Sequence, residues 1–237
     1  MSEGTAGDPD AALEQLAGAM RRISAVAVGH PIADDALGEA TEALLRVADR
    51  LEAQAEERKR PRAQPHPATD PGRLFPCSPV IGTANPVAPP AYVWAVTGEG
   101  GQREIRGRVT FGYPYEGPPT CVHGGVIAEL FDELLGSANI IANQPGMTGT
   151  LTVRYRKPTP LFAPLDLQAR YTGSDGRKVY TSGAIFHDGE LTAEAEGIFI
   201  AMPPGRMLDI VTTNAREAAV PVVDDEFIEL IGEDPAG

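Results

Sequence analysis

The 237-residue sequence has few cysteines and no long apolar run, and each absence excludes a class of protein. Its two cysteines, Cys77 and Cys121, lack CxxC spacing and make no disulfide framework, so we expect a reducing, cytoplasmic compartment. No stretch approaches eighteen apolar residues, so we expect no membrane span and no membrane partner. The first residues, Met-Ser-Glu-Gly-Thr-Ala-Gly-Asp, include acidic side chains where a signal peptide needs basic and then apolar residues. We therefore expect no signal peptide.

Basic residues are also scarce, since 20 Lys+Arg stand against 33 Asp+Glu and give a formal net charge of −13. This acidity excludes a general nucleic-acid binder, which needs a basic surface to neutralise phosphates. Only three of the bases are lysines, which together with abundant Ala, Gly and Pro indicates a GC-rich bacterial source. His30, His66 and His187 show no metal-ligand spacing, and no phosphate-loop or dinucleotide motif is present. We therefore expect neither a metal nor a cofactor.

The negative charge is concentrated at the two ends of the chain. Residues 1–70 hold 13 acids and 8 bases, residues 71–202 hold 12 and 10, and residues 203–237 hold 8 and 2. The ends therefore carry −11 of the net charge, and the middle carries only −2. A nearly neutral middle does not repel an anionic substrate.

The chain divides into four predicted parts. Residues 1–60 are an N-terminal helical hairpin extension, because apolar residues recur at helical spacing on both sides of Gly29-His30-Pro31. We interpret the hairpin as an element for packing or oligomerisation. Residues 61–90 contain nine prolines, which predicts a linker without regular structure that lies over the surface. Residues 91–203 form a folded domain, and residues 204–237 form an acidic C-terminal tail that is either disordered or docked as a last element.

The folded domain is predicted to be α+β. Alternating apolar residues and turn signals indicate six strands, and helical spacing indicates one long helix from Gly124 to Ala142 between the second strand and the third. The predicted strands are 92–96, 104–111, 149–155, 165–172, 178–187 and 191–202. One long helix followed by antiparallel strands is typical of an α+β domain of about 110 residues.

The long helix contains the candidate catalytic acid. It is apolar over most of its circumference, which predicts a helix buried against the sheet. Asp132 lies on the remaining face, in a strip of small residues formed by Gly124, Gly125, Ala128 and Gly136. A carboxylate in a crowded, partly dry strip is poorly solvated, which favours a role as base or nucleophile. The alternative is a solvated helix acid, which fits the flanking Glu129 and Glu133 better.

His123-Gly124-Gly125 stands at the beginning of the same helix. The first turn of a helix has unpaired N–H groups and the positive end of the helix dipole. Glycine there lets a substrate carbonyl oxygen approach the backbone, as an oxyanion hole requires. The alternative is that the glycines only allow a tight turn, which His123 caps.

Taken together, the motifs resemble those of the hotdog-fold acyl-CoA thioesterases of the PaaI-like group, from about Val93 to Ala201. The resemblance rests on His123-Gly124-Gly125 with Asp132 nine residues after the histidine. Three motifs surround that pair in the same order, namely Glu116-Gly117-Pro118-Pro119, Val153-Arg154-Tyr155-Arg156-Lys157-Pro158 and Asp175-Gly176-Arg177-Lys178. The ordered series is specific, whereas HGG alone is a weak signal.

The resemblance implies a hotdog fold, an antiparallel sheet wrapped around one long central helix, and hydrolysis of acyl-CoA to a carboxylate and free CoA. It implies a homodimer or homotetramer with sites between protomers. Asp132 would be the catalytic carboxylate, the Gly124 N–H would hold the thioester oxygen with His123 shaping the turn, and the Thr148 hydroxyl would orient the attacking water. The implied substrate and CoA contacts are Gly125, Arg154, Arg156, Ser174, Asp175, Gly176, Arg177, Lys178 and Val179.

The sequence departs from that family in two respects. Some relatives carry Asn or Gln shortly before HGG, where this chain has Glu116, Gly117 and Pro118. The hairpin also lies outside the match, and its alternatives are capping the acyl pocket, oligomerisation or neither. Two other functions stay open, a hotdog hydratase or dehydratase of enoyl or hydroxyacyl thioesters and a non-catalytic acyl-CoA-binding module. The acyl group also stays open among aliphatic, aromatic and steroid thioesters.

Overall fold

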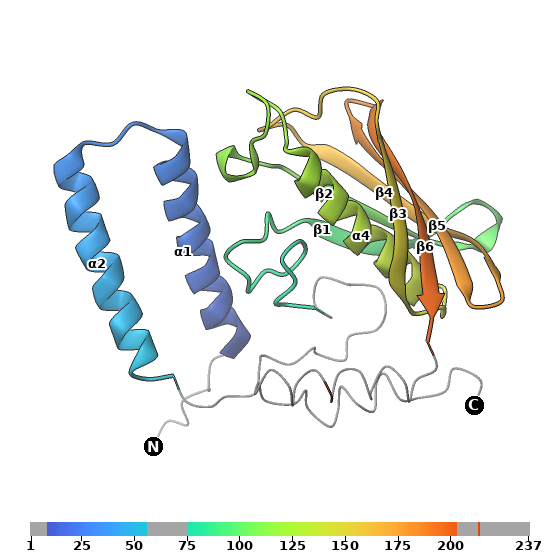
Figure 1. Ribbon diagram of the computed structural model, residues 1–237, viewed down its shortest axis with the longest axis horizontal. Coiled ribbons are helices and arrows are strands. Elements are labelled where there is room, and N and C mark those ends of the chain that lie inside the picture. Colours follow the sequence, from blue (N-terminus) through green and yellow to red (C-terminus); the bar gives the residue numbers. More distant parts are fainter. Residues whose placement is uncertain (1–8, 56–74, 203–212, 214–237) are drawn as a thin grey trace, which may run out of the picture.

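The computed structural model describes residues 9–55, 75–202 and 213 (Figure 1). The acidic tail predicted for 204–237 therefore lies outside the described residues, apart from Thr213, as do residues 56–74 around the predicted linker. Two N-terminal helices, α1 (Pro9–Gly29) and α2 (Asp34–Glu52), confirm the two helices predicted for the extension. No helix of the described segments is both long and apolar enough to cross a membrane.

The folded domain is a six-stranded antiparallel sheet and one long helix, α4 (Gly124–Ile141). The strand order is β1-β2-β4-β5-β6-β3, so β1 and β3 form the two edges. All six predicted strands are present, as β1 (Tyr92–Thr97), β2 (Arg103–Val109), β3 (Gly146–Tyr155), β4 (Leu165–Asp175), β5 (Lys178–His187) and β6 (Glu190–Ala201). Two short 3₁₀ turns, η1 (Glu99–Gly101) and η2 (Tyr113–Tyr115), lie in the connections.

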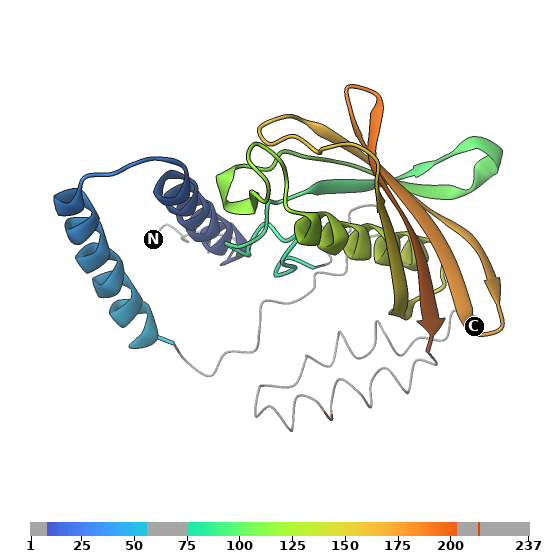
Figure 2. The same ribbon diagram turned by 45° about the horizontal axis from the view of Figure 1, so that its top comes forward.

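The sheet curves around α4, as Figure 2 shows, and this is the hotdog arrangement. Phe131, Leu134 and Leu135 of α4 are fully buried against the sheet. The side chains of each strand alternate between two faces. On β4, Leu165, Leu167 and Ala169 face α4, whereas Asp166 and Arg170 face away from it. The side of the sheet that faces away from α4 is called the outer face below.

Residues 75–90 correct the prediction of a linker over the surface. They contain no helix or strand, as their prolines predict, but Val80 and Ile81 are 4% and 1% exposed and belong to the core. The Ser78 Oγ accepts hydrogen bonds from both N–H groups, at 3.1 Å and 3.2 Å, which fixes a tight turn at this point. Apolar side chains between the prolines therefore make the segment part of the domain.

Helix α1 is held against the domain, but α2 is not. Ala17 is 1% exposed, and the Arg21 Nη1 donates to the carbonyl oxygens of Thr83 (3.1 Å) and Asn85 (2.8 Å). Gly29 lies so close to the Tyr113 ring that a Cβ atom there would stand 2.1 Å from it. In contrast, α2 has no buried residue.

Candidate active site

Helix α4 begins at a turn that leaves the Gly124 N–H open. His123 is the N-cap, and its Nδ1 accepts a hydrogen bond from the Gly125 N–H at 3.0 Å. The Gly124 N–H lies in the first turn, where the helix supplies no acceptor, and no described residue accepts a hydrogen bond from it. This confirms His123 as a cap and leaves the Gly124 N–H available at the positive end of the helix.

The motif before this turn has a structural role. The Glu116 Oε1 accepts a hydrogen bond from the Thr120 N–H at 2.7 Å, and Glu116 pairs with Val122 in an isolated bridge. A Cβ atom on Gly117 would stand 2.7 Å from the His123 Cα, so only glycine allows this approach. Glu116 and Gly117, which replace the Asn or Gln of some relatives, therefore shape the turn that presents Gly124.

Tyr155 of β3 covers this turn, although it is not among the site residues predicted from the sequence. Its hydroxyl donates to the Gly124 carbonyl oxygen at 2.7 Å. Alternation along β3 carries the signal that could have found it, because Tyr155 lies between two outward arginines and so points toward α4. Its side chain is 54% exposed, so an aromatic ring stands at the open side of the Gly124 turn.

Asp132 and Thr148, which the resemblance links, are in contact. The Thr148 hydroxyl donates to the Asp132 Oδ1 at 2.7 Å. Thr148 stands where the pairing of β3 with β6 shifts register between Thr148 and Thr150, an irregularity of the kind that re-aims side chains near functional sites. The structure therefore joins a carboxylate of α4 to a hydroxyl of β3.

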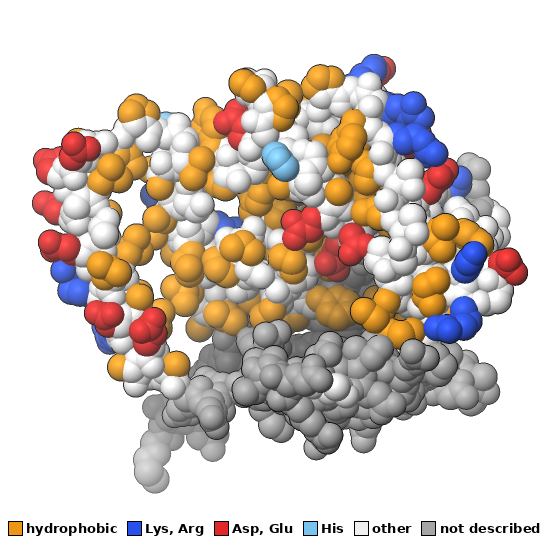
Figure 3. All heavy atoms as spheres, in the orientation of Figure 1, with side chains coloured by type: hydrophobic (Ala, Val, Ile, Leu, Met, Phe, Trp, Pro, Cys, Tyr) orange, Lys and Arg blue, Asp and Glu red, His pale blue; other side chains and the backbone are white. Residues whose placement is uncertain are grey.

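The crowded, partly dry environment expected for Asp132 is not present within one chain. Asp132 and Glu129 are both exposed, because the sheet covers the opposite side of α4 and leaves this face open. The space-filling view shows acidic side chains at the surface, bordered by apolar ones (Figure 3). A second surface must cover this face if the site is to exclude water.

Glu133 is partly buried and held by the 75–90 segment. The Ser78 hydroxyl donates to the Glu133 Oε2 at 2.7 Å. Burial raises the pKa of Glu133, the Ser78 hydrogen bond opposes this rise, and the negative charges of Asp132 and Glu129 add to it. Glu133 thus joins α4 to the 75–90 segment, whereas Asp132 joins α4 to Thr148 of β3.

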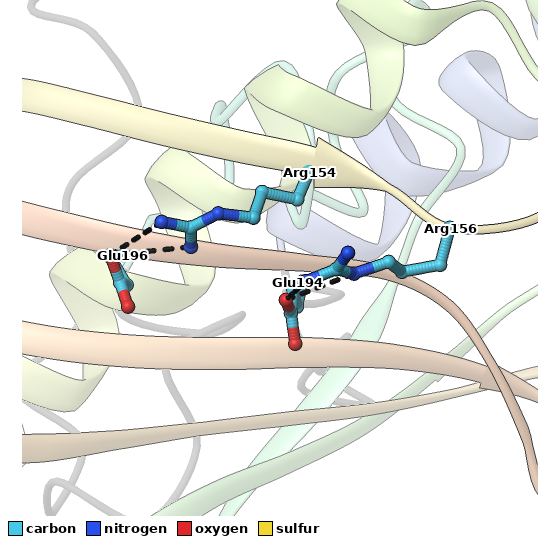
Figure 4. Close-up of polar contacts among 4 residues, drawn as sticks. All are labelled: Arg154, Arg156, Glu194 and Glu196. Atoms are coloured by element: carbon cyan, nitrogen blue, oxygen red, sulfur yellow. Dashed lines mark hydrogen bonds and ion pairs between the residues drawn. The ribbon is translucent and has the colours of Figure 1, made fainter.

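The arginines expected to contact CoA lie on the outer face and are already ion-paired (Figure 4). Arg154 contacts the Glu196 carboxylate at 3.3 Å, and Arg156 contacts that of Glu194 at 2.5 Å. Lys157 pairs with Glu190 in the same way. The structure therefore does not bring these three bases to Asp132, and β6 carboxylates neutralise their charges.

The turn between β4 and β5 is different, because no described carboxylate pairs with Arg177 or Lys178. The Arg177 Nε donates to the Ala201 carbonyl oxygen at 3.3 Å, and the Ser174 Oγ accepts from the Tyr171 hydroxyl at 3.1 Å. Gly176 has a φ of +56°, which suits glycine, and Asp175 opens the turn. Val179, the last predicted contact, is completely buried because it faces α4, so its side chain is not available to a ligand.

A polar hollow of about 740 Å³ lies on the outer face of the sheet. It includes Arg106 with its partner Glu104, and Arg154 with its partner Glu196. None of its lining residues is Asp132, Thr148 or Gly124. Within residues 9–55 and 75–202, no three His, Cys, Asp or Glu side chains gather as metal ligands.

The chain is similar to known thioesterases. No family model matches it. The acyl-coenzyme A thioesterase THEM4 of Xenopus laevis is 38% identical over 94 residues, which are 38% of this chain and 42% of that protein. The Mus musculus THEM4 is 33% identical over 99 residues, 41% of this chain and 43% of that protein, so the match spans less than half the length of these relatives. The crystal structure of protein RHA08564, a thioesterase superfamily protein, is similar at a TM-score of 0.70 and 34% identity, over 84% of this chain and 92% of that chain.

Proposed function

The chain belongs to the thioesterase superfamily, and we propose from this membership and the geometry around Asp132 that it hydrolyses acyl-CoA to a carboxylate and free CoA. The observation that carries the proposal is the hydrogen bond from Thr148 to Asp132 on the face of α4 that also presents Gly124. The nine-residue spacing from His123 to Asp132 supports the PaaI-like group. The proposal includes a cytoplasmic location and a bacterial source.

Asp132 acts on the thioester carbon as base or nucleophile. As a base it takes a proton from water, whose oxygen bonds to the carbon, while the C–S bond breaks and the thiolate is protonated. As a nucleophile its own oxygen forms that bond, and water then hydrolyses the anhydride. In both cases the Gly124 N–H stabilises the negative oxygen of the tetrahedral intermediate. Thr148 orients Asp132 or the water beside it.

The site needs two copies of the chain. Gly124 and Asp132 are eight residues apart on one helix, about 12 Å along its axis. The reacting atoms of one carbonyl must approach each group to about 3 Å, which a single α4 does not allow. We therefore place the Gly124 N–H of one copy beside Asp132 of another, in a homodimer or homotetramer.

The edge strand β3 supports this pairing. It lies at the sheet edge, carries Thr148 beside α4, and leaves the backbone groups of its free side unpaired within the described chain. Pairing with β3 of a second copy would continue the sheet and bring a second α4 alongside the first. That helix would cover the exposed face around Asp132.

CoA is bound by the turn between β4 and β5. Arg177 and Lys178 offer positive charge that no described carboxylate neutralises, which suits the phosphates of the nucleotide. Ser174, Asp175 and Gly176 complete the turn. Arg154 and Arg156 could bind CoA only if their ion pairs with Glu196 and Glu194 were broken.

A thiol-release assay over a panel of acyl-CoAs tests the function. Asp132→Asn is expected to lower kcat by at least about 100-fold, the scale of an acid–base group, while CoA still binds. The matched control is Glu129→Gln, an exposed acid of the same helix that should keep wild-type kcat. Near wild-type turnover of Asp132→Asn would overturn its role. Retained CoA binding without thiol release from any substrate would favour a binding module, and hydration of an enoyl-CoA without thiol release would favour a hydratase.

A further inference from the structure

Helix α2 presents an apolar face that nothing in the described chain covers. Ten of the fifteen large apolar side chains that are exposed in the described residues belong to α1 and α2. On α2, Leu37, Leu44 and Leu51 are 41%, 44% and 48% exposed, and no residue of the helix is buried. An isolated helix of nineteen residues with such a face is at best marginally stable, because helices in proteins depend on burying their apolar face.

Helix α1 adds a second uncovered stripe. Its Ala17 and Arg21 face the domain, whereas Leu16, Met20 and Ile23 are 37%, 46% and 44% exposed. Figures 1 and 2 show the two helices standing apart, and Figure 3 shows apolar side chains of both along the opening between them. Neither helix therefore covers the apolar stripe of the other. We call the two stripes together the hairpin surface.

The spacing on α2 indicates what covers this surface. Leu37, Leu44 and Leu51 recur every seven residues, the period of helices that pack along a common seam. A two-fold axis beside Leu44 would place Leu37 of one α2 opposite Leu51 of a second, antiparallel α2. Small residues flank the leucines at Ala40, Thr41 and Ala48, which lets two helices approach closely. The seam is thus complementary to itself.

We propose that the hairpin surface docks against the hairpin surface of a second copy of this chain, with the two α2 helices antiparallel in a four-helix bundle. The area is sufficient. Eight of the ten lie along the two stripes, because Val28 and Leu45 point to other sides of their helices. A side chain of this size has about 100 Å² of apolar surface, which is its burial energy of about 2.5 kcal/mol divided by 25 cal/mol per Å². Eight side chains that are roughly half exposed therefore supply about 400 Å². A standard interface of about 800 Å² per partner is a little over half apolar, which is a similar area.

The hairpin contact is separate from the pairing proposed for the active site. The hairpin lies at one end of the molecule, and the edge strand β3 lies away from it, beyond α4 (Figure 1). Two different two-fold contacts on one chain close into an assembly of four chains where their axes cross at right angles, and the proposal includes this arrangement. The hairpin therefore joins two dimers, each formed through the β3 edge as proposed for the active site. Loss of the hairpin contact should leave each dimer intact.

The mass of the full-length protein by sedimentation equilibrium tests this inference. Wild type is expected at four times the 25.0 kDa chain mass. Leu44→Glu/Leu51→Glu should halve the mass and keep thiol release, because it places charges in the seam. The matched control is Gly38→Glu/Ala53→Glu, which adds the same two charges about 120° and 180° around α2 from Leu44, away from the seam. The Gly38 position is open. The control should keep the wild-type mass.

Each result of this experiment decides a question. An unchanged mass of Leu44→Glu/Leu51→Glu, or a halved mass of the control as well, would overturn the hairpin contact. A two-chain wild type that becomes one chain in Leu44→Glu/Leu51→Glu would support the hairpin contact and overturn the site pairing. A one-chain wild type would overturn both.

A cysteine cross-link tests the seam without disturbing the helix. In a Cys77→Ser/Cys121→Ser background, Leu44→Cys should form disulfide-linked pairs under oxidation, because the two-fold axis brings the two positions together. Gly38→Cys, about 120° around α2 from Leu44, should form none. Equal linking at both positions, or none at Leu44→Cys, would overturn the antiparallel seam.

Discussion

At the scale of single residues, the candidate site combines what the sequence contains with what only the fold supplies. The spacing on α4 identifies Asp132, because one acid stands in a strip of small residues. Its contact with Thr148 joins residues sixteen positions apart in different elements, so it follows from the resemblance and not from any local pattern. Alternation along β3 predicts that Tyr155 points toward α4, but its target is a backbone carbonyl oxygen of a distant residue, which no motif identifies.

The hydrogen bond from Thr148 to Asp132 predicts a specific effect on turnover. Thr148→Val keeps the shape of the side chain but removes a bond to a carboxylate, which is worth about 1.5 to 3 kcal/mol. We expect kcat to fall by about 10- to 100-fold with little change in KM. Thr148→Ser should restore most of the activity. Thr150→Val, on the same strand, serves as the control, and an equal loss there would contradict a role for the Thr148 hydroxyl.

Glu133 predicts a dependence of stability on pH. Burial raises its pKa, opposed by the Ser78 hydrogen bond and assisted by Asp132 and Glu129, so the folded state binds this proton more tightly than the unfolded state. Its stabilising contribution is complete below the unfolded pKa of about 4.3 and is lost as pH rises through the raised folded value. Glu133→Gln stays neutral throughout. The free energy of unfolding of Glu133→Gln, measured relative to that of wild type, should therefore increase from pH 4 to pH 7.

Urea unfolding at several pH values measures this difference. The matched control is Glu39→Gln, which changes an exposed carboxylate on α2 that has no part in the pKa shift of Glu133. Parallel stability curves for Glu133→Gln and wild type would contradict the prediction.

At the scale of elements, alternation and turn residues were sufficient to predict every strand and α4. The partners of the charged side chains were not predictable in this way. Arg154 forms an ion pair with Glu196 only because β3 pairs with β6, and the two residues are forty-two positions apart in the chain. The burial of Val80 and Ile81 was also missed, because nine prolines in residues 61–90 outweighed the few apolar side chains between them.

The ion pairs of β3 predict which bases contribute to CoA binding. Lys178→Ala should raise the KM for acyl-CoA by about tenfold, because it removes a charge that no described carboxylate neutralises, and this effect should shrink at high salt. Arg154→Ala should change KM less than about twofold, since Glu196 already neutralises that arginine and an exposed ion pair is worth about 1 kcal/mol or less. Steady-state kinetics at two salt concentrations measure both. The reverse order of effects would move the CoA site to the outer face.

At the scale of the whole molecule, the sequence predicted the fold class but not the order of the strands, which depends on contacts between distant segments. It did predict where the charge lies, and the nearly neutral domain is the part that carries the site. A site assembled from two chains has no trace in local sequence. The resemblance implies such a site, and the proposal is supported when the eight-residue separation of Gly124 and Asp132 is converted into length along a helix.

Mixing two inactive chains tests the two-chain site directly. Asp132→Asn removes the carboxylate, and Gly124→Pro removes the N–H donor. Proline is favoured at the first position of a helix, and His123 has the extended backbone that precedes proline well. The nearest atom to a Cβ at position 124 is the Tyr155 hydroxyl at 3.4 Å, so the ring should be accommodated.

Each variant alone should be nearly inactive, but the two refolded together in equal amounts should recover activity. Half of the pairs are then hybrids, and each hybrid keeps one intact site made of the Gly124 of one chain and the Asp132 of the other. The thiol-release rate should thus reach about a quarter of wild type, with half of the pairs contributing one of two sites. Chains folded separately and then mixed are the control and should recover nothing before subunits exchange. A site contained in one chain would give no recovery in either case, because every chain then lacks one of the two groups.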